Sequence, residues 1–425
     1  MNFYPRKVVN QVEDYLYFPK KIIILLWPRQ VGKTTILKHL YEKVTKPKFY
    51  FNLEKYSHCE KFATETDLLS FLSSQWLDIS KELYLFVDEF QHCKSSEKIF
   101  KILYDEYPNI KVIATGSLSM EIKHKIQESL AWRKKIFYIY SLDLEEFIAW
   151  KKLVNWEKVE NPWALHWFLD LSGNIDIFVK EYVNWLKEYM IWWGYPEVVL
   201  SSAEQEKKEI LESIFDLYLK KDIINFLQIR HIDCFKKILT YLAVNSWGQL
   251  VYDGLANFAW CSIHTVKDYL EVLEQSFLVK RLAPFHTNKN IEIKKQPKVY
   301  FLDNGVRNWF VNNFAQPELR QDAGQLFEVV FYQVLIKNWF KSDFIKYWRS
   351  KDNRYEVDFV LEKDWKIDLF EVKFKQKIKQ SDWKGIKKFA ELYPKLVNRW
   401  LVIAMVREQE KKVYHMLDVY DLVGV

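Results

Sequence analysis

The stretch that decides the fold of this chain is Ile22-Ile23-Ile24-Leu25-Leu26-Trp27-Pro28-Arg29-Gln30-Val31-Gly32-Lys33-Thr34-Thr35. An apolar run, a short loop and the start of a helix follow one another, which indicates a buried strand that turns tightly into a helix. Backbone N–H groups of such a loop, together with the positive end of the helix, attract phosphate groups. Lys33 is placed to reach the β- and γ-phosphates of a nucleotide, and the Thr34 hydroxyl is placed to hold Mg²⁺.

One position departs from the phosphate-loop pattern G-x-x-x-x-G-K-[ST], because the pattern has glycine where this chain has Trp27. The alternative to a phosphate loop is a lysine that follows a strand by chance. Strand, Gly-Lys-Thr and helix nevertheless occur in the required order. We therefore predict that the nucleotide is bound by Pro28, Arg29, Gln30, Val31, Gly32, Lys33, Thr34 and Thr35.

Tryptophan is unusually common in this chain and glycine is unusually rare. The 425 residues include 18 Trp and 10 Gly, so glycine is about 2% where about 7% is usual. Several tryptophans stand where glycine is the expected residue, among them Trp365, which follows Asp364 between two strand-like runs where Asp-Gly is a strong hairpin signal. We hypothesise that some tryptophans are glycines whose UGA codons were translated as tryptophan; the candidates are Trp27, Trp132, Trp193, Trp260 and Trp365. The alternative is a tryptophan-rich protein with a degenerate loop, and Trp348 looks like a genuine strand residue.

Composition is that of a globular protein of two to four domains, with 49% hydrophobic and 28% charged residues. The net charge of +7 permits contact with nucleic acid without requiring it. The four cysteines, Cys59, Cys93, Cys234 and Cys261, form no C-x-x-C pair, and we expect free thiols in a reducing cytosol. No apolar run approaches the length of a membrane span, so we expect a soluble, cytoplasmic protein without a membrane partner.

A second apolar run, residues 83–87, ends in the acidic pair Asp88 and Glu89. An aspartate at the carboxyl end of a neighbouring parallel strand can hold Mg²⁺, and the adjacent glutamate can act as general base toward water. Together with Lys33 and Thr34, this pair predicts one centre that binds ATP and Mg²⁺.

Two further segments carry candidate catalytic residues. The strand-like run 111–117 contains Thr115 and Ser117, whose hydroxyls are candidates to sense the γ-phosphate or position water; helix capping is the equally open alternative. Arg133 precedes another strand-like run and is a candidate arginine finger or sensor, with a surface salt bridge as the alternative.

These motifs resemble those of a family of prokaryotic AAA+-type P-loop ATPases that are fused to a C-terminal domain of unknown function. The segments that carry the resemblance are 28–35, Val87-Asp88-Glu89-Phe90-Gln91, Thr115-Gly116-Ser117, 142–147, Trp193-Gly194-Tyr195-Pro196-Glu197, 300–305, 356–360 and Glu371-Val372-Lys373. They span nearly the whole chain. The family pattern has glycine where this chain has Trp27, Trp132 and Trp193, which agrees with the recoding hypothesis.

We expect an α/β protein of four parts. Residues 1–150 are predicted to form the P-loop ATPase domain with an AAA+-like parallel sheet, 151–230 a helical lid or connector, 231–290 a winged helix, and 291–425 a restriction-endonuclease-like (PD-(D/E)XK-like) α/β domain. Ser262 is a plausible N-cap of the second helix of the winged segment. The module can place Ser262, His264, Thr265 and Lys267 in a DNA major groove, or it can pack against protein.

The C-terminal part contains a further acidic set, Glu328, Asp358, Glu371 and Lys373. It resembles the D…E-x-K arrangement of restriction-endonuclease-like folds, in which acids bind Mg²⁺ and a lysine stabilises charge at the scissile phosphate. The alternative is an inert scaffold that exposes charged strand residues.

The sequence thus favours an ATP-hydrolysing ATPase whose cycle gates a DNA-binding or nuclease-like C-terminal module. Its predicted ligands are ATP and Mg²⁺, and DNA, a protein partner or further copies of the chain stay open as partners. A nucleotide-dependent switch that binds protein or DNA and cuts nothing is the second hypothesis. A third is an inactive ATPase in which Trp27 blocks the phosphate loop.

Overall fold

The computed structural model describes residues 4–17, 21–27, 31–117, 130–154, 175–217, 231–337, 342–363, 365–406 and 412–416. The chain packs as two compact units, the first made of Met1–Leu142 with Tyr195–Glu197 and the second of Asp143–Gly194 with Val198–Val425. Within the described ranges, no helix combines the length and the apolar character that crossing a bilayer requires.

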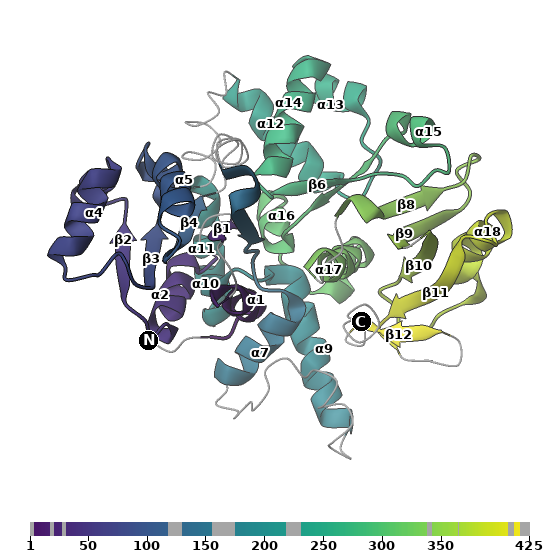
Figure 1. Ribbon diagram of the computed structural model, residues 1–425. Coiled ribbons are helices and arrows are strands. Elements are labelled where there is room, and N and C mark those ends of the chain that lie inside the picture. Colours follow the sequence, from purple (N-terminus) through teal and green to yellow (C-terminus); the bar gives the residue numbers. More distant parts are fainter. Residues whose placement is uncertain are drawn as a thin grey trace. The chain divides into compact units, whose positions relative to one another are not determined.

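The first unit is built on a five-stranded sheet in which every neighbouring pair of strands is parallel, in the order β2-β3-β4-β1-β5 (Figure 1). Its elements are α1 (Lys7–Leu16), β1 (Ile22–Trp27), α2 (Lys33–Lys43), β2 (Lys48–Asn52), α3 (Tyr56–Lys61), α4 (Glu65–Ser74), β3 (Leu83–Asp88), η1 (Phe90–His92), α5 (Ser96–Glu106), β4 (Ile110–Ser117), η2 (Ala131–Arg133) and β5 (Lys134–Tyr138). The predicted parallel α/β sheet is confirmed.

The two most apolar strands occupy the interior of this sheet. All six residues of β3 are buried, and β1 lies between β4 and β5. Such continuous apolar runs are typical of parallel strands enclosed on both faces. Because the strands run in one direction, the chain leaves β1, β3 and β4 at the same edge of the sheet, where the predicted site residues follow.

The described residues that follow this sheet in the chain, up to residue 217, are mainly helical. Their helices are α7 (Leu144–Val154), α9 (Ile175–Trp192), α10 (Pro196–Leu200) and α11 (Glu204–Leu217). Residues 155–174 and 218–230 lie outside the described part of the chain.

Three helices and a two-stranded antiparallel sheet follow. They are α12 (Ile232–Val244), α13 (Tyr252–Ala259), α14 (Ile263–Gln275), β6 (Val279–Leu282) and β7 (Lys298–Phe301), with α15 (Lys289–Lys294) between the strands. Ser262 caps α14 as expected, since its hydroxyl accepts a hydrogen bond of 3.1 Å from the backbone N–H of Thr265.

The C-terminal part is a five-stranded mixed sheet in the order β12-β11-β10-β9-β8. Its elements are α16 (Asn304–Phe310), η4 (Pro317–Leu319), α17 (Ala323–Lys337), η5 (Ser342–Phe344), β8 (Ile345–Arg349), β9 (Glu356–Lys363), β10 (Lys366–Val372), η6 (Gln380–Trp383), α18 (Lys384–Leu392), β11 (Val397–Ala404) and β12 (Val413–His415). Figure 1 shows α17 and α18 on opposite sides of this sheet. Successive residues of β10 alternate between the two faces: Leu369 lies in the core that includes Phe389 of α18, and Phe370 packs against Phe331 of α17.

The cysteine prediction is wrong for one pair. Cys59 of α3 and Cys93, which follows η1, form a disulfide across 34 residues of sequence. Their spacing gives no local signal, and only the packing of α3 beside η1 brings the two sulfur atoms together. Cys234 and Cys261 are free thiols, as expected.

Candidate functional site

The phosphate-loop segment has the backbone conformation that its glycine permits. Gly32 precedes α2 with φ of 86°, in the left-handed region that a side chain resists. The carbonyl of Val31 accepts a hydrogen bond of 2.9 Å from Arg6, whose guanidinium also donates to the carbonyl of Tyr140 at 2.7 Å. Arg6 is 4% exposed, so a buried cation fixes the loop. The predicted ligands Pro28, Arg29 and Gln30, and the Trp27 side chain, lie outside the described residues.

A segment far along the chain lies against this loop. A Cβ atom placed on Gly32 would lie 4.0 Å from Cγ of Pro196. Pro196 belongs to the Trp-Gly-Tyr-Pro-Glu segment, and residues 195–197 pack with the first unit. The sequence does not predict this neighbour.

Asp88 is the centre of the hydrogen bonds at the carboxyl edge of the sheet. One carboxylate oxygen accepts from the Thr34 hydroxyl at 3.1 Å and from the Tyr50 hydroxyl at 2.8 Å, and the other accepts from the Thr115 hydroxyl. Asp88 is 1% exposed. Burial, with Asp88 close by, raises the pKa of Tyr50 far above its usual value, which keeps this phenol a donor. Tyr50, on β2, is a site residue that the sequence analysis missed.

Lys33 and Glu89 form an ion pair in the same cluster. The other carboxylate oxygen of Glu89 accepts a hydrogen bond from Gln91, and the Glu89 backbone N–H donates to Thr115 at 3.1 Å. Glu89 has φ of 54°, a left-handed conformation that costs a non-glycine residue roughly 1–2 kcal/mol. Strain of this kind gathers at functional sites because the surrounding contacts hold it in place.

The remaining candidates of the first unit differ in position. The structure brings Lys33, Thr34, Asp88, Glu89 and Thr115 together, and the fully buried Thr115 hydroxyl links Asp88 to the Glu89 backbone. Thr35 is exposed in the first turn of α2, and the Ser117 side chain lies outside the described residues. Arg133 instead forms two hydrogen bonds with Asp105, at 2.8 and 3.0 Å.

The Thr34–Asp88 pair has the chemistry of a magnesium site. A hydroxyl oxygen and a carboxylate oxygen suit Mg²⁺, which keeps several waters and is usually bound with substrate phosphates rather than by protein alone. In the described ranges, no group of three or more His, Cys, Asp and Glu side chains is arranged to hold a metal ion. The two protein oxygens therefore fit a metal that a nucleotide helps to bind.

The C-terminal candidates also come together. Lys373, which follows β10, forms ion pairs with Asp358 at 3.1 Å and with Glu371 at 2.6 Å. Asp358 also accepts the Val372 backbone N–H at 2.8 Å. The second carboxylate oxygen of Glu371 is buried and has no hydrogen-bond partner, and burial, with Asp358 nearby, raises the pKa of Glu371 well above its usual value.

Glu328 joins this cluster from α17 through residues of β7. Its carboxylate accepts a hydrogen bond from the Tyr300 hydroxyl and lies 3.6 Å from Lys298. Lys298 also pairs with Glu356 at the start of β9. Burial raises the pKa of Glu328 to about 7, while the ammonium of Lys298 opposes that rise. The sequence analysis did not single out Lys298 or Tyr300, because both lie in β7, which pairs with β6 and not with the sheet that carries Asp358 and Glu371.

Three family descriptions match the chain in succession. Residues 19–148 match the family described as AAA domain, residues 183–317 match a domain of unknown function (DUF8612), and residues 323–421 match another domain of unknown function (DUF4143). The first match contains the Lys33–Asp88 cluster, and the third contains the Asp358–Lys373 cluster.

Relatives of the chain are described as uncharacterized. One from Methanocaldococcus jannaschii is 26% identical over 365 residues, which cover 84% of this chain and 75% of the relative. One from Haemophilus influenzae is 23% identical over 331 residues, which cover 76% and 74%. Among solved structures, the Thermotoga maritima RuvB Holliday junction branch migration motor aligns with 66% of this chain and 90% of its own, at 15% identity and a TM-score of 0.28. At that score the alignment carries no structural argument.

The parallel sheet and the AAA match agree on the same segment of the chain. The N-terminal part therefore matches an AAA domain and the C-terminal part matches a domain of unknown function, in the order that the sequence predicts.

Proposed function

We propose that the chain binds and hydrolyses ATP at the cluster of Lys33, Thr34, Asp88 and Glu89. The observation that carries the proposal is the hydrogen bond of 3.1 Å between Thr34 and Asp88, beside the ion pair of Lys33 and Glu89. An ammonium and a hydroxyl from the start of α2 thus meet two consecutive carboxylates at the end of β3, where a phosphate-binding loop enters a helix. These are the groups that P-loop NTPases use to hold a nucleotide and its metal.

Each residue has a role that its contacts support. On binding, the γ-phosphate takes the Lys33 ammonium from Glu89, which frees that carboxylate to accept a proton from water. Thr34 and Asp88 would hold Mg²⁺, which supplies neutralisation of phosphate charge. Thr115 would hold Asp88 and Glu89 in position, since its hydroxyl bonds to the Asp88 carboxylate and to the Glu89 backbone N–H. Arg133 would act as an arginine finger or sensor only after releasing Asp105.

Binding of Mg-ATP to the full chain tests this proposal. Lys33→Ala should abolish the affinity, because a phosphate ligand is lost from the loop. Lys38→Ala is the matched control, since Lys38 is exposed on the same helix. Both variants are measured with tryptophan and with glycine at position 27. If neither form of the parent chain bound Mg-ATP, or if Lys33→Ala bound as tightly as Lys38→Ala, the proposal would fail.

The four predicted parts of the chain would meet near residues 150, 230 and 290. ATP hydrolysis in the first part would gate the activity of the C-terminal part. Asp358 and Glu371 supply carboxylate oxygens that suit a divalent cation, and the unpartnered oxygen of Glu371 offers a buried ligand. Lys373 would then stabilise charge at a phosphodiester. Plasmid cleavage with Mg²⁺ or Mn²⁺ tests this: Asp358→Asn should abolish it, and Asp352→Asn, in the exposed loop before β9, should not.

The arrangement of Lys373 favours a second function, a nucleotide-dependent switch without nuclease activity. Its ammonium already bonds both carboxylates, so the pair is neutralised without a metal ion. Equal absence of cleavage in the parent chain and in Asp358→Asn, alongside ATP turnover, would favour the switch.

The three helices and the β6–β7 sheet would form a winged helix that binds DNA through α14. His264 and Lys267 are exposed on this helix, but Asp268 forms an ion pair of 2.8 Å with His264. The same face is also available to a protein partner, and the DNA titration described below distinguishes the two.

A further inference from the structure

Tryptophan occupies many of the left-handed backbone positions of this chain. Among the described residues, eleven that are not glycine have positive φ. Five of them are tryptophan: Trp76 (59°), Trp193 (62°), Trp247 (75°), Trp260 (57°) and Trp365 (65°). In this region Cβ crowds the carbonyl oxygen, so bulky residues are outliers there and glycine is the usual occupant. Of the described glycines, Gly32 is the one with positive φ.

Three of the five tryptophans follow helix ends at a position that is normally glycine. After α9, the Trp193 N–H bonds to the Tyr189 carbonyl at 2.9 Å, which is the single bond of the simpler left-handed helix end. After α4, the Trp76 N–H bonds to the Ser73 carbonyl at 3.0 Å, and the next N–H, of Leu77, reaches back to Leu72 at 3.1 Å. Trp260 and Cys261 make the same pair of bonds after α13. This is the Schellman motif, whose left-handed residue is usually glycine and sometimes asparagine.

Other residues in the same motif show what the chain does elsewhere. Asn312 occupies the position after α16, as expected, and Phe277 occupies it after α14. One bulky residue is therefore accommodated at a helix end. Helix ends alone therefore do not distinguish tryptophan from other bulky residues, whereas tight turns have stricter requirements for glycine.

Two further tryptophans stand in tight turns. Gly248 N–H bonds to the Asn245 carbonyl at 3.2 Å, which puts Trp247 at the third position of a β-turn, where positive φ calls for glycine or asparagine. Trp365 precedes β10 in the two-residue connection from β9, whose ends pair as Lys363 with Lys366. Hairpins of this length favour Asn-Gly or Asp-Gly, and the sequence here is Asp-Trp.

Three of these tryptophan side chains project into solvent, whereas Trp193 stacks on Tyr189 and Trp247 packs beneath the Arg307 guanidinium. Trp76, Trp260 and Trp365 are 96%, 84% and 97% exposed. Trp193 and Trp247 are buried, and each leaves its indole N–H without a hydrogen-bond partner, a penalty that buried tryptophans usually avoid. By contrast, Trp348 lies in β8 without positive φ, is 4% exposed and packs edge-on against Phe389.

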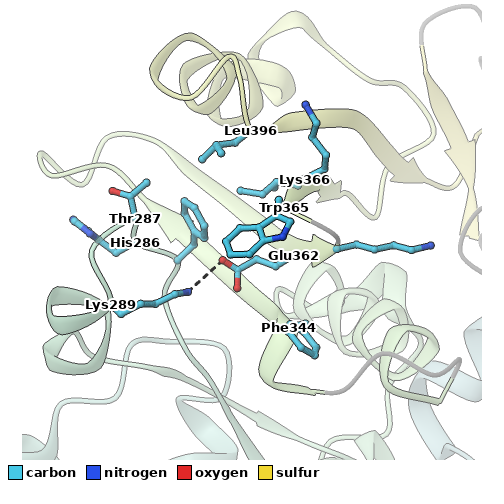
Figure 2. Close-up of a pocket in the computed structure, with 11 residues that line it drawn as sticks. His286, Thr287, Lys289, Phe344, Glu362, Trp365, Lys366 and Leu396 are labelled. Carbon is cyan, nitrogen blue, oxygen red and sulfur yellow. Dashed lines mark hydrogen bonds and ion pairs between the residues drawn. The ribbon is translucent and has the colours of Figure 1, made fainter.

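Trp365 also forms part of the wall of a pocket of about 590 Å³. Figure 2 shows its indole among the lining side chains, between Glu362 and Leu396. If position 365 is glycine, the pocket lacks this indole wall. We therefore infer no ligand from the shape of the pocket.

We infer that the natural polypeptide has glycine at positions 76, 193, 247, 260 and 365, encoded by UGA codons that were translated as tryptophan. Trp132 lies outside this group, because its own φ is not positive. A reassigned codon acts wherever it occurs, so we extend the inference to position 27, where glycine completes the G-x-x-x-x-G-K-T pattern that ends at Thr34. Only this extension rests on the proposed nucleotide site.

Mass spectrometry of peptides from the protein made in its source organism tests the inference directly, together with the codons of the gene. In peptides that cover the five positions, the residue at each position should have the mass of glycine. The codon for each position should be UGA. The peptide that contains Trp348 should have the mass of tryptophan, encoded by UGG. Tryptophan in the source protein at the five positions would overturn the inference, whatever the activity of the chain.

Stability of the recombinant full chain provides a second readout. Trp76→Gly, Trp260→Gly and Trp365→Gly should each raise the melting temperature by about 2 °C, because relief of the left-handed backbone strain outweighs the greater freedom of glycine in the unfolded chain. The control Trp348→Gly should lower it, because a packed core residue is lost. Lower melting temperatures for all three exposed positions would contradict the strain argument.

The identity of residue 27 and the binding of Mg-ATP are independent measurements. Glycine at position 27 in the source protein, without Mg-ATP binding by that form, would refute the ATPase and leave the recoding intact. Tryptophan at position 27, with Mg-ATP binding, would refute the extension and leave the ATPase intact.

Discussion

The Thr34 hydroxyl in the first turn of α2 donates a hydrogen bond of 3.1 Å to the Asp88 carboxylate at the end of β3. This bond joins the two motifs of the proposed nucleotide site. If both oxygens hold Mg²⁺, Thr34→Ala should weaken Mg-ATP binding by about tenfold or more, equivalent to about 1.4 kcal/mol or more. Thr34→Ser keeps the hydroxyl and should bind normally. Calorimetric titration with and without Mg²⁺ measures both variants, and unchanged Mg-ATP affinity in Thr34→Ala would remove Thr34 from the metal site.

Tyr50 orients the same carboxylate from β2, at 2.8 Å. Tyr50→Phe removes one donor to a buried anion, so the free energy of unfolding should fall by about 1–2 kcal/mol. If Tyr50 had only a structural role, the substitution would change stability and leave the Mg²⁺ dependence of turnover unchanged. If Tyr50 positions this carboxylate for Mg²⁺, Tyr50→Phe should also raise the Mg²⁺ concentration that gives half-maximal ATP turnover, with little change in the binding of metal-free ATP. An unchanged Mg²⁺ dependence would limit Tyr50 to stability.

Glu328 should make the stability of the chain depend on pH. Burial raises its pKa from 4.5 to about 7 in the folded protein. Between these values the folded protein binds more protons than the unfolded chain, so its stability falls as pH rises through this window. The contribution is about 3 kcal/mol. Urea unfolding at about pH 5 and about pH 8 should show a smaller loss for Glu328→Gln than for the parent chain, with Glu371 contributing to the slope of both. Equal losses would contradict the assignment.

Lys267 tests DNA binding by α14. If Lys267 contacts a phosphate, Lys267→Ala should weaken binding to duplex DNA of any sequence and reduce the salt dependence of log Kd by about 1. Lys387→Ala, exposed on α18, is the control. Fluorescence anisotropy across a salt series supplies the slopes, and identical slopes for the two variants would favour a protein partner for this face.

The sequence reveals those parts of the site that are contiguous motifs. Lys33 and Thr34 follow an apolar strand, and Asp88 and Glu89 follow another, so the parallel arrangement of the strands alone brings them to one edge. The same reasoning locates Glu371 and Lys373 at the end of β10 and predicts the hairpin from β9.

Residues that reach the site through tertiary packing give no such signal. Arg6, which precedes α1, donates to the Val31 carbonyl, and Tyr50 reaches Asp88 from β2. Pro196 approaches Gly32 from a segment more than a hundred residues away in sequence, and the Cys59–Cys93 disulfide depends on how α3 packs beside η1. A tyrosine in an aromatic strand or an arginine before a helix fits many structures equally well, so only the fold identifies its partner.

Hydrolysis of ATP by Glu89→Gln tests the central claim most directly. The measurement uses the full chain with glycine at position 27 and compares steady-state turnover with Mg-ATP affinity. We expect Glu89→Gln to bind Mg-ATP as tightly as the parent and to hydrolyse it about 10²- to 10⁴-fold more slowly, because the general base is lost. Turnover equal to that of the parent would show that ATP is not hydrolysed at this centre.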